Sequence, residues 1–358
     1  LHSAAVTVEG AVHAGSDVTF SAVNAGNFST RSTAASITAE HAKGNIISAA
    51  VGISVNSNKA TVDVKSDVTT NEYSKVDIAS RLTMNMEEGF ISRLPVQSLS
   101  GAVSGKGTSK YIAGAAAVTV SHAVSKAEVT GINAKLEGGA VSVTAFDQSK
   151  LGARAGGVNI STGANVGAGV SAAVIYSDNE VTASVADGVE VSAHTFQLDA
   201  VKKAITWENF VLPWKWTDVF TDSTMLSDEE RAQVQTGLID IHREATEWGY
   251  NYKVDLNLDT YALMKLFDAG NMLAFNNYYT AAIAGSLVTG TADEDGSANA
   301  FNGAGAFSIV RTDNRVKAKL GNGVFIHRPT VGKGGSADGV RIYAEDTSTA
   351  RLIGGALA

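Results

Sequence analysis

The chain has 358 residues and carries 28 Lys and Arg against 36 Asp and Glu, a formal net charge of −8. This acidic balance argues against a nucleic-acid-binding surface, which needs a basic face. The absence of cysteine excludes a disulfide framework, a thiolate nucleophile and a cysteine-based zinc site. Charged residues are only 18% of the chain, which is unlike a disordered acidic protein.

The two ends of the chain do not have the features of protein termini. Leu1-His2-Ser3-Ala4 lacks the basic and apolar regions of a signal peptide, and residues 354–358 continue a Val- and Ala-rich pattern. We therefore expect a fragment of a larger protein.

Short strands are predicted from the first residues onward. Apolar and small polar residues alternate at period 2 in runs of four to six residues that end at Gly, Asn or Asp. Two loosely similar runs, at 49–64 and 115–129, are each followed by a second short strand, at 76–79 and 141–145. The chain has only 3 prolines, so nearly every backbone N–H can donate to a strand ladder.

Two stretches of this strand pattern need a separate interpretation. A small excursion is predicted at 81–108, where the Ser- and Gly-rich run 98–108 is expected to be flexible. Residues 155–177 contain no charge, which can indicate a membrane span. Interspersed Asn, Ser and Thr argue against a span, so we predict a strand-rich segment.

A clear internal repeat indicates the fold class. Gly167-Ala-Gly169 leads to Asp178-Asn179-x-Val181-x-Ala183, and the copy reads Gly303-Ala-Gly305 and then Asp313-Asn314-x-Val316-x-Ala318. We place tight turns at the Asp-Asn pairs, followed by second strands at 189–193 and 340–344. Because one such coil cannot bury its own inner face, the coils must stack. The predicted fold is mainly β, a β-solenoid and by preference a right-handed parallel β-helix, with an antiparallel sandwich or a barrel as alternatives.

An aromatic-rich insertion with an α-helical pattern is predicted within the solenoid. Residues 203–281 contain all four Trp. Ser227-x-x-Glu230 fits a helix capping box, apolar residues follow at helical spacing as far as Trp248, and a second helix is expected at 260–269. The predicted domains are therefore a first part of the solenoid at 1–202, an inserted helical module at 203–281 and the rest of the solenoid at 282–358.

The start of the insertion is the candidate partner-binding site. Trp and Tyr dominate the energetics of protein interfaces, although these rings also suit the small core of the module. Trp216, beside Lys215, is the ring that we expect to be exposed. The candidate residues are Trp207, Phe210, Trp214, Lys215, Trp216 and Phe220.

Patterns that would indicate catalysis or metal binding are weak. The seven His are scattered without zinc-site spacing, and Asp293-Glu-Asp295-Gly296 lacks the later ligands of a calcium loop. Asn27-Phe-Ser29 and Asn159-Ile-Ser161 match glycosylation sequons. Stacking could bring Asp178 and Asp313 to one edge, as a glycosidase requires. We predict no catalytic residue, metal or cofactor.

The Gly-Ala-Gly…Asp-Asn-x-Val-x-Ala copies, with the looser copies at 49–64 and 115–129, resemble the Ala/Gly/Val-rich β-helical repeat regions of giant bacterial surface proteins of the adhesin type. The resemblance covers most of the chain outside 203–281 and implies an extracellular or cell-surface location. We expect a non-enzymatic binding protein whose stalk presents the insertion to a host glycoprotein, such as an immunoglobulin, or to a glycan. The alternatives are a carbohydrate-active β-helix, a polysaccharide lyase or glycosidase, and a pure structural spacer.

Overall fold

The computed structural model describes residues 2–26, 30–38, 45–83, 96–104, 110–162, 166–204, 220–222, 224–225, 230, 239–246, 249–256, 276–289, 301–329 and 337–358. The chain divides into two compact units. The large unit comprises Leu1–Asn85, Leu94–Ile205 and Asn276–Ala358, and the small unit comprises Met86–Arg93 and Thr206–Phe275. Each unit is described by itself.

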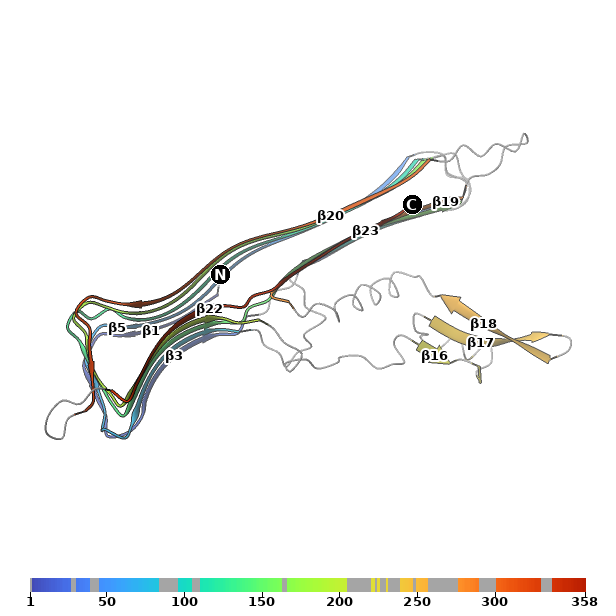
Figure 1. The fold of residues 1–358 in the computed structure, drawn as a ribbon. Coiled ribbons are helices and arrows are strands. Elements are labelled where there is room, and N and C mark those ends of the chain that lie inside the picture. Colours follow the sequence, from blue (N-terminus) through green and yellow to red (C-terminus); the bar gives the residue numbers. More distant parts are fainter. Residues whose placement is uncertain are drawn as a thin grey trace. The chain divides into compact units, whose positions relative to one another are not determined.

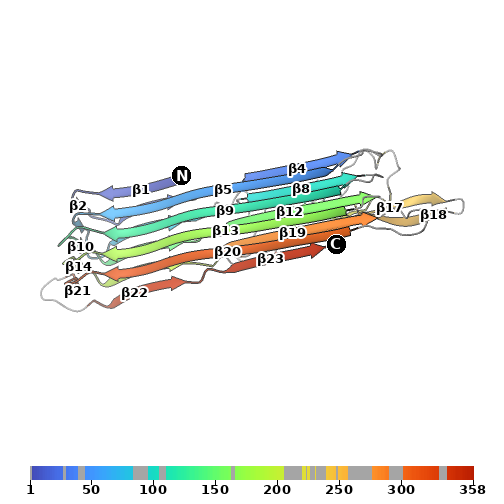
Figure 2. The same ribbon diagram turned by 90° about the horizontal axis from the view of Figure 1, so that it is seen from above.

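The large unit is a solenoid built from four five-stranded parallel sheets. Each coil contributes one strand to every sheet, and the described residues form five coils (Figures 1 and 2). We call the sheets the long, corner, middle and return sheets, in the order in which the chain visits them. The long sheet contains β1 (His2–Val8), β5 (Ile46–Val64), β9 (Lys110–Val129), β13 (Val166–Val185) and β20 (Phe301–Leu320).

The other three sheets complete each coil. The corner sheet contains β2 (Val12–His13), β6 (Val68–Thr69), β10 (Lys135–Glu137), β14 (Glu190–Ser192) and β21 (Phe325–His327). The middle sheet contains β3 (Val18–Asn24), β7 (Lys75–Leu82), β11 (Ala140–Asp147), β15 (Thr195–Lys202) and β22 (Gly339–Asp346). The return sheet contains β4 (Thr30–Thr38), β8 (Val96–Ser104), β12 (Leu151–Thr162), β19 (Tyr278–Thr289) and β23 (Ala350–Leu357).

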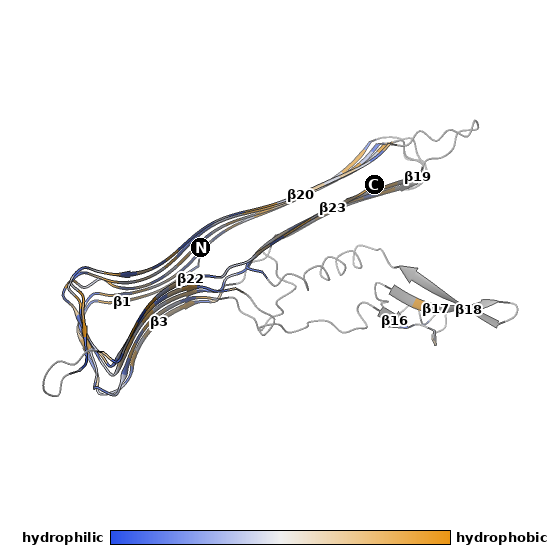
Figure 3. Ribbon diagram, viewed as in Figure 1, coloured by the Kyte–Doolittle hydropathy of each residue, from blue (hydrophilic) through white to orange (hydrophobic). Residues whose placement is uncertain are grey.

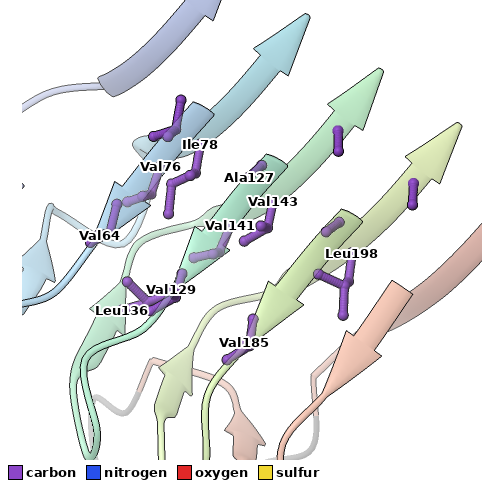
Figure 4. Close-up of a cluster of buried hydrophobic side chains, with 14 of the residues drawn as sticks. Val64, Val76, Ile78, Ala127, Val129, Leu136, Val141, Val143, Val185 and Leu198 are labelled. Carbon is purple, nitrogen blue, oxygen red and sulfur yellow. The ribbon is translucent and has the colours of Figure 1, made fainter. Parts of the chain in front are cut away.

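Each coil has a triangular end and a flat arm (Figure 1). The triangular end is enclosed by the long, corner and middle sheets, and aliphatic side chains fill it (Figure 4). Residues that are register partners on successive strands form columns of similar side chains. Each side chain of a column packs against the next coil. Burial of this kind stabilises the fold by about 1.5–3 kcal/mol per fully buried Val or Leu. One such column is Val8, Val64, Val129, Val185 and Leu320, and another is Val12, Val68, Leu136, Val191 and Ile326.

In the arm, the long sheet packs against the return sheet, and most of the side chains between them are small, although Tyr111, Ile175 and Tyr279 are also buried. A Cβ added to Gly157 of β12 would lie 2.5 Å from the carbonyl oxygen of Val170 on β13. The hydroxyl of Ser171 donates to the carbonyl of Ile283 (2.6 Å) and accepts from the N–H of Gly157 (2.7 Å). Ala, Gly and Ser therefore fill most of the interior of the arm, because at positions such as Gly157 and Ser171 the two backbones approach too closely for larger residues.

The predicted parallel solenoid is confirmed, and the Asp178-Asn179 and Asp313-Asn314 copies of the repeat pair in register. The Gly-Ala-Gly copies at 167–169 and 303–305 are offset by one residue, and the predicted turns are wrong. Asp178 pairs with Asp313, and Asn179 pairs with Asn314, in the middle of the extended strands β13 and β20. There Asn179 points inward and is held by hydrogen bonds, so it does not need a turn. The positive φ angles near the corners are those of Asn133, Gly188 (φ 71°) and Gly323 (φ 67°) among the described residues.

One predicted second strand was assigned to the wrong sheet. Residues 340–344 lie in β22, whose partner is β15 in the middle sheet. Residues 190–192, inside the predicted strand 189–193, form β14 of the corner sheet instead. Both segments alternate Val with polar residues, and this alternation does not distinguish the short corner strand from the longer strand that follows it.

The Ser- and Gly-rich run that was expected to be flexible is partly a strand. Residues 96–104 form β8 of the return sheet. Ser100 faces the interior, where its hydroxyl donates to the carbonyl of Ser48 (2.7 Å). The small residues here reflect the narrow arm, while 84–95 and 105–109 lie outside the described residues.

The uncharged stretch from 155 to 177 is described as strand, in β12 and β13, apart from residues 163–165, which lie outside the described residues. Among the described residues, the structure has no helix that is both long and apolar enough to cross a membrane.

In the small unit, a sheet replaces the expected helix over 239–246, whereas Glu230 is helical. β16 (Phe220–Asp222) pairs parallel with β17 (Ile239–Thr246), which pairs antiparallel with β18 (Gly249–Leu256). The helical assignment is therefore wrong over 239–246, because Ile241 and Ala245 share a strand face as well as a helix face. In β18, Tyr250, Tyr252 and Val254 alternate with polar residues as strand residues do. The helix predicted at 260–269 lies outside the described residues.

Candidate binding surface

The insertion leaves the fourth coil at the corner between the middle sheet and the return sheet. In the third coil, β11 ends at Asp147 and β12 begins at Leu151. In the fourth coil, β15 ends at Lys202 and β19 begins at Tyr278, and these residues are the register partners of Asp147 and Leu151. The insertion therefore does not shift the register of the neighbouring coils.

Hydrogen bonds from Asn277 close this corner. Its side-chain amide donates to the carbonyls of Ser149 (3.2 Å) and Lys203 (2.9 Å), while its oxygen accepts from the N–H of Thr349 (3.0 Å). Asn277 is fully buried, so one side chain joins three successive coils and holds the two ends of the insertion beside each other.

An ion pair is buried next to this corner. The ammonium of Lys202 contacts the carboxylate of Asp147, and the two side chains are 1% and 0% exposed. Lys202 is also the register partner of Asp346 in the fifth coil, so it lies between two carboxylates. Burial lowers the pKa of Lys202, but the charge of Asp147 and interactions with Tyr278 outweigh burial and raise it. Removing one charge would leave the other buried and uncompensated, which is costly.

Tyr278 connects the ion pair to the long sheet. Its hydroxyl accepts from the amide of Asn179 (2.8 Å) and donates to the amide oxygen of Asn314 (2.9 Å). The amide of Asn314 in turn donates to the carboxylate of Asp346 (2.8 Å). Burial is the main cause of the raised pKa of Tyr278. The network is structural, because its members satisfy one another from the buried Tyr278 and Asn179 to the exposed Asp346.

Two further cations are buried near the start of β12. Lys150 is 6% exposed and Arg154 is 2% exposed. Burial, and then the charge of Arg154, lower the pKa of Lys150 to about 7. Lys150 is therefore partly neutral near pH 7, unlike a surface lysine.

The outer side of the long sheet is apolar along the arm. Along the strands of the solenoid as a whole, hydrophobic residues are interspersed with hydrophilic ones (Figure 3). Four side chains of β5 are well exposed on the outer side of the arm: Ile47 (68%), Val51 (61%), Ile53 (59%) and Val55 (73%). The outward positions on the neighbouring strands are also apolar, at 112–120 on β9, 168–176 on β13 and 303–309 on β20. We call this surface the apolar face. It exists because the small residues are needed inside the arm, which leaves the aliphatic residues outside.

Charged residues begin on the same sheet where the apolar face ends. The ring nitrogen Nδ1 of His122 lies 3.3 Å from the carboxylate of Asp178, and the ammonium of Lys126 lies 2.7 Å from that of Glu180. Burial raises the pKa of Glu180, but the hydrogen bond and charge of Lys126 outweigh it and lower the pKa. These half-exposed pairs border a hollow of ≈ 460 Å³ lined by Ser3, Ser57, Lys59, His122, Val124, Lys126 and Glu180.

Asp178 and Asp313 do lie side by side, as the repeat predicted. The guanidinium of Arg315 is 2.6 Å from the carboxylate of Asp313 and 3.7 Å from that of Asp178. Asp178 also faces His122. The geometry makes these carboxylates members of a surface ion-pair network, which does not separate them into a general acid and a base.

Most of the predicted site residues cannot be placed. Trp207, Phe210, Trp214, Lys215 and Trp216 lie outside the described residues, as does the Asp293–Gly296 turn. Phe220 is the first residue of β16, and its side chain is not described. The proposed role of the aromatic cluster therefore stays a prediction.

Other sequence motifs can be located. Asn159 of the second sequon is fully buried, and its amide donates to the carbonyl of Tyr111 (3.3 Å), so it is not an acceptor for a glycan in the folded chain. The first sequon, at 27–29, lies outside the described residues. Among the described residues, no three His, Asp or Glu side chains are grouped as metal ligands would be.

The apolar face was missed at the sequence level. Its signal is the alternation in 46–56, where Ile and Val occupy four of the five odd positions and Ser, Ala, Gly and Asn occupy most of the even ones. Period 2 alone does not show which of the two sets faces inward. Comparisons with known proteins add no assignment, since no family model, curated protein or solved structure matches the chain.

Proposed function

We propose that this chain is a non-enzymatic binding segment of a bacterial surface or secreted protein of the adhesin type. In this proposal the solenoid is a stalk that presents the insertion to a host glycoprotein, of which immunoglobulin is the first candidate. The contacts would come from the aromatic residues that open the insertion, chiefly Trp214 and Trp216.

The observation that carries the proposal is the way the insertion leaves the coil. About 70 residues are accommodated between Lys203 and Asn277 without a shift in register, and Asn277 closes the corner behind them. Such an excursion is not needed for the solenoid to stack, which supports a role beyond folding. The resemblance to repeat regions of bacterial surface proteins supports the same function.

Deletion of the insertion is the test. A short Gly/Ser linker between Ala204 and Asn276 removes 205–275 and keeps Asn277 and the buried Tyr278. Pull-downs from serum and mucus then compare this variant with the full chain, after circular dichroism has shown that both are β-rich. We expect a partner that only the full chain captures.

Point variants refine the test in the full-length chain. Trp214→Ala with Trp216→Ala should reduce capture at least about tenfold, as loss of aromatic anchors does. Tyr73→Ala, a change of a solenoid residue that is 85% exposed, should leave capture unchanged. Capture by the deletion variant would place recognition on the solenoid, and the absence of any partner would contradict a binding function.

A further inference from the structure

None of the residues that the structure describes covers the apolar face, and its area is at the upper end of what monomeric proteins expose. Its outward positions at 47–55, 112–120, 168–176 and 303–309 contain no charged residue. These positions lie on four strands about 4.8 Å apart, with outward residues about 6.8 Å apart along each strand. There are five such residues on β5, β9 and β13 and four on β20, where Arg311 occupies the position beside Tyr176. The patch measures roughly 20 by 30 Å. Monomeric proteins rarely leave contiguous apolar patches larger than a few hundred Å² in water.

We propose that the apolar face is an interface between two copies of this chain, which pack long sheet against long sheet. Covering the patch on both copies removes about 1,200 Å² from water, the lower end of the range for specific interfaces. Two-fold packing is possible because one flat face serves both partners.

The regular spacing of the side chains favours a second copy over other occupants. The face consists of rows that repeat from strand to strand, such as Ile53, Val118, Val174 and Ile309. A second solenoid presents rows with the same spacing, so that the two sets interdigitate as in packed β-sheets. A globular partner or a lipid surface has no such period.

The border of the face fits this interface. Beyond Val55 and Tyr176 the next outward row contains His122 and Asp178, whose side chains lie 3.3 Å apart. A polar rim around an apolar centre is the usual anatomy of an interface. Farther along the same sheet, Lys126 and Glu180 pair opposite charges, so two copies can approach without strong net repulsion.

The test is the association state of the full chain by sedimentation equilibrium over a wide range of concentrations. We expect a reversible dimer. Ile53→Lys with Ile309→Lys puts charges at both ends of the row that also contains Val118 and Val174, and should raise the dimer dissociation constant at least about tenfold. If the lysine variant does not fold, Ile53→Ser with Ile309→Ser tests the same row, with circular dichroism as the check on folding.

The matched control adds the same charges elsewhere. Thr19→Lys with Ser21→Lys changes two exposed residues of β3 in the middle sheet and should leave the dimer intact. A wild-type chain that stays monomeric at all concentrations would overturn the proposal, as would a dimer that is insensitive to the Ile53 and Ile309 changes. Sedimentation with phosphatidylcholine vesicles, if it depended on Ile53 and Ile309 in a monomeric chain, would assign the face to lipid instead.

Discussion

Lys202 lies in the interior of the solenoid beside the carboxylate of Asp147, next to the corner from which the insertion leaves. Lys202→Met would leave Asp147 charged and buried without its partner, so we expect a loss of about 3–5 kcal/mol in the free energy of unfolding. The measurement is urea denaturation followed by circular dichroism.

The matched double variant separates charge from packing. Leu82 occupies the position equivalent to Asp147 on the preceding strand, so Asp147→Leu continues a side chain that this column already accepts. Lys202→Met with Asp147→Leu should therefore recover most of the lost stability. A double variant no more stable than Lys202→Met would show that the pair acts through its shape rather than its charge.

Lys150 should make stability depend on pH. Its pKa is about 7 in the folded chain against 10.5 for an ordinary lysine. Between these values the unfolded chain binds one more proton, so raising the pH from 7 toward 10.5 stabilises the fold, by a few kcal/mol. The raised pKa of Lys202 affects stability only above this window. Urea titrations at about pH 6, 8 and 10 should show that the free energy of unfolding rises with pH in the wild type but not in Lys150→Met. The same dependence on pH in both proteins would contradict the prediction.

At the scale of elements, the arm depends on how closely two sheets approach. Gly157→Ala would place a methyl group 2.5 Å from the carbonyl oxygen of Val170 and 2.9 Å from that of Ala113, both backbone atoms. We expect the free energy of unfolding to fall by about 1–3 kcal/mol, which would be measured as a lower midpoint of thermal unfolding. Gly305→Ala, on β20 with no atom within 4 Å of the new Cβ, should be neutral or slightly stabilising. Equal effects would mean that the sheets separate easily.

Much of this arrangement could be predicted from strand periodicity. The Asp178 and Asp313 copies were aligned correctly because in-register stacking repeats the same residue types at the same depth. The assignment of 189–193 failed because a corner strand and a middle strand share one pattern. The sheet at 239–256 was missed because Ile241 and Ala245 satisfy two periods at once, so that only the partner strand β18 decides between them.

At the scale of the whole solenoid, every coil contributes one layer to the aliphatic core and buries that layer against the neighbouring coils. The valine columns are fully buried in the inner coils, whereas Val316 and Leu320 of the fifth coil are only half-buried. The outermost strands of each sheet, such as β1 and β20 in the long sheet, have a partner on one side only. Stability therefore accumulates coil by coil, as in other repeat proteins.

The corner at Asn277 has a consequence for how such a chain can change. Its bond to the carbonyl of Lys203 keeps the points of departure and return within one hydrogen bond of each other. Because the coil already fixes both points, the closure entropy of whatever chain lies between them grows only slowly with its length. A foreign domain with adjacent termini can therefore be inserted there in place of the present insertion, and none of the coils has to be redesigned.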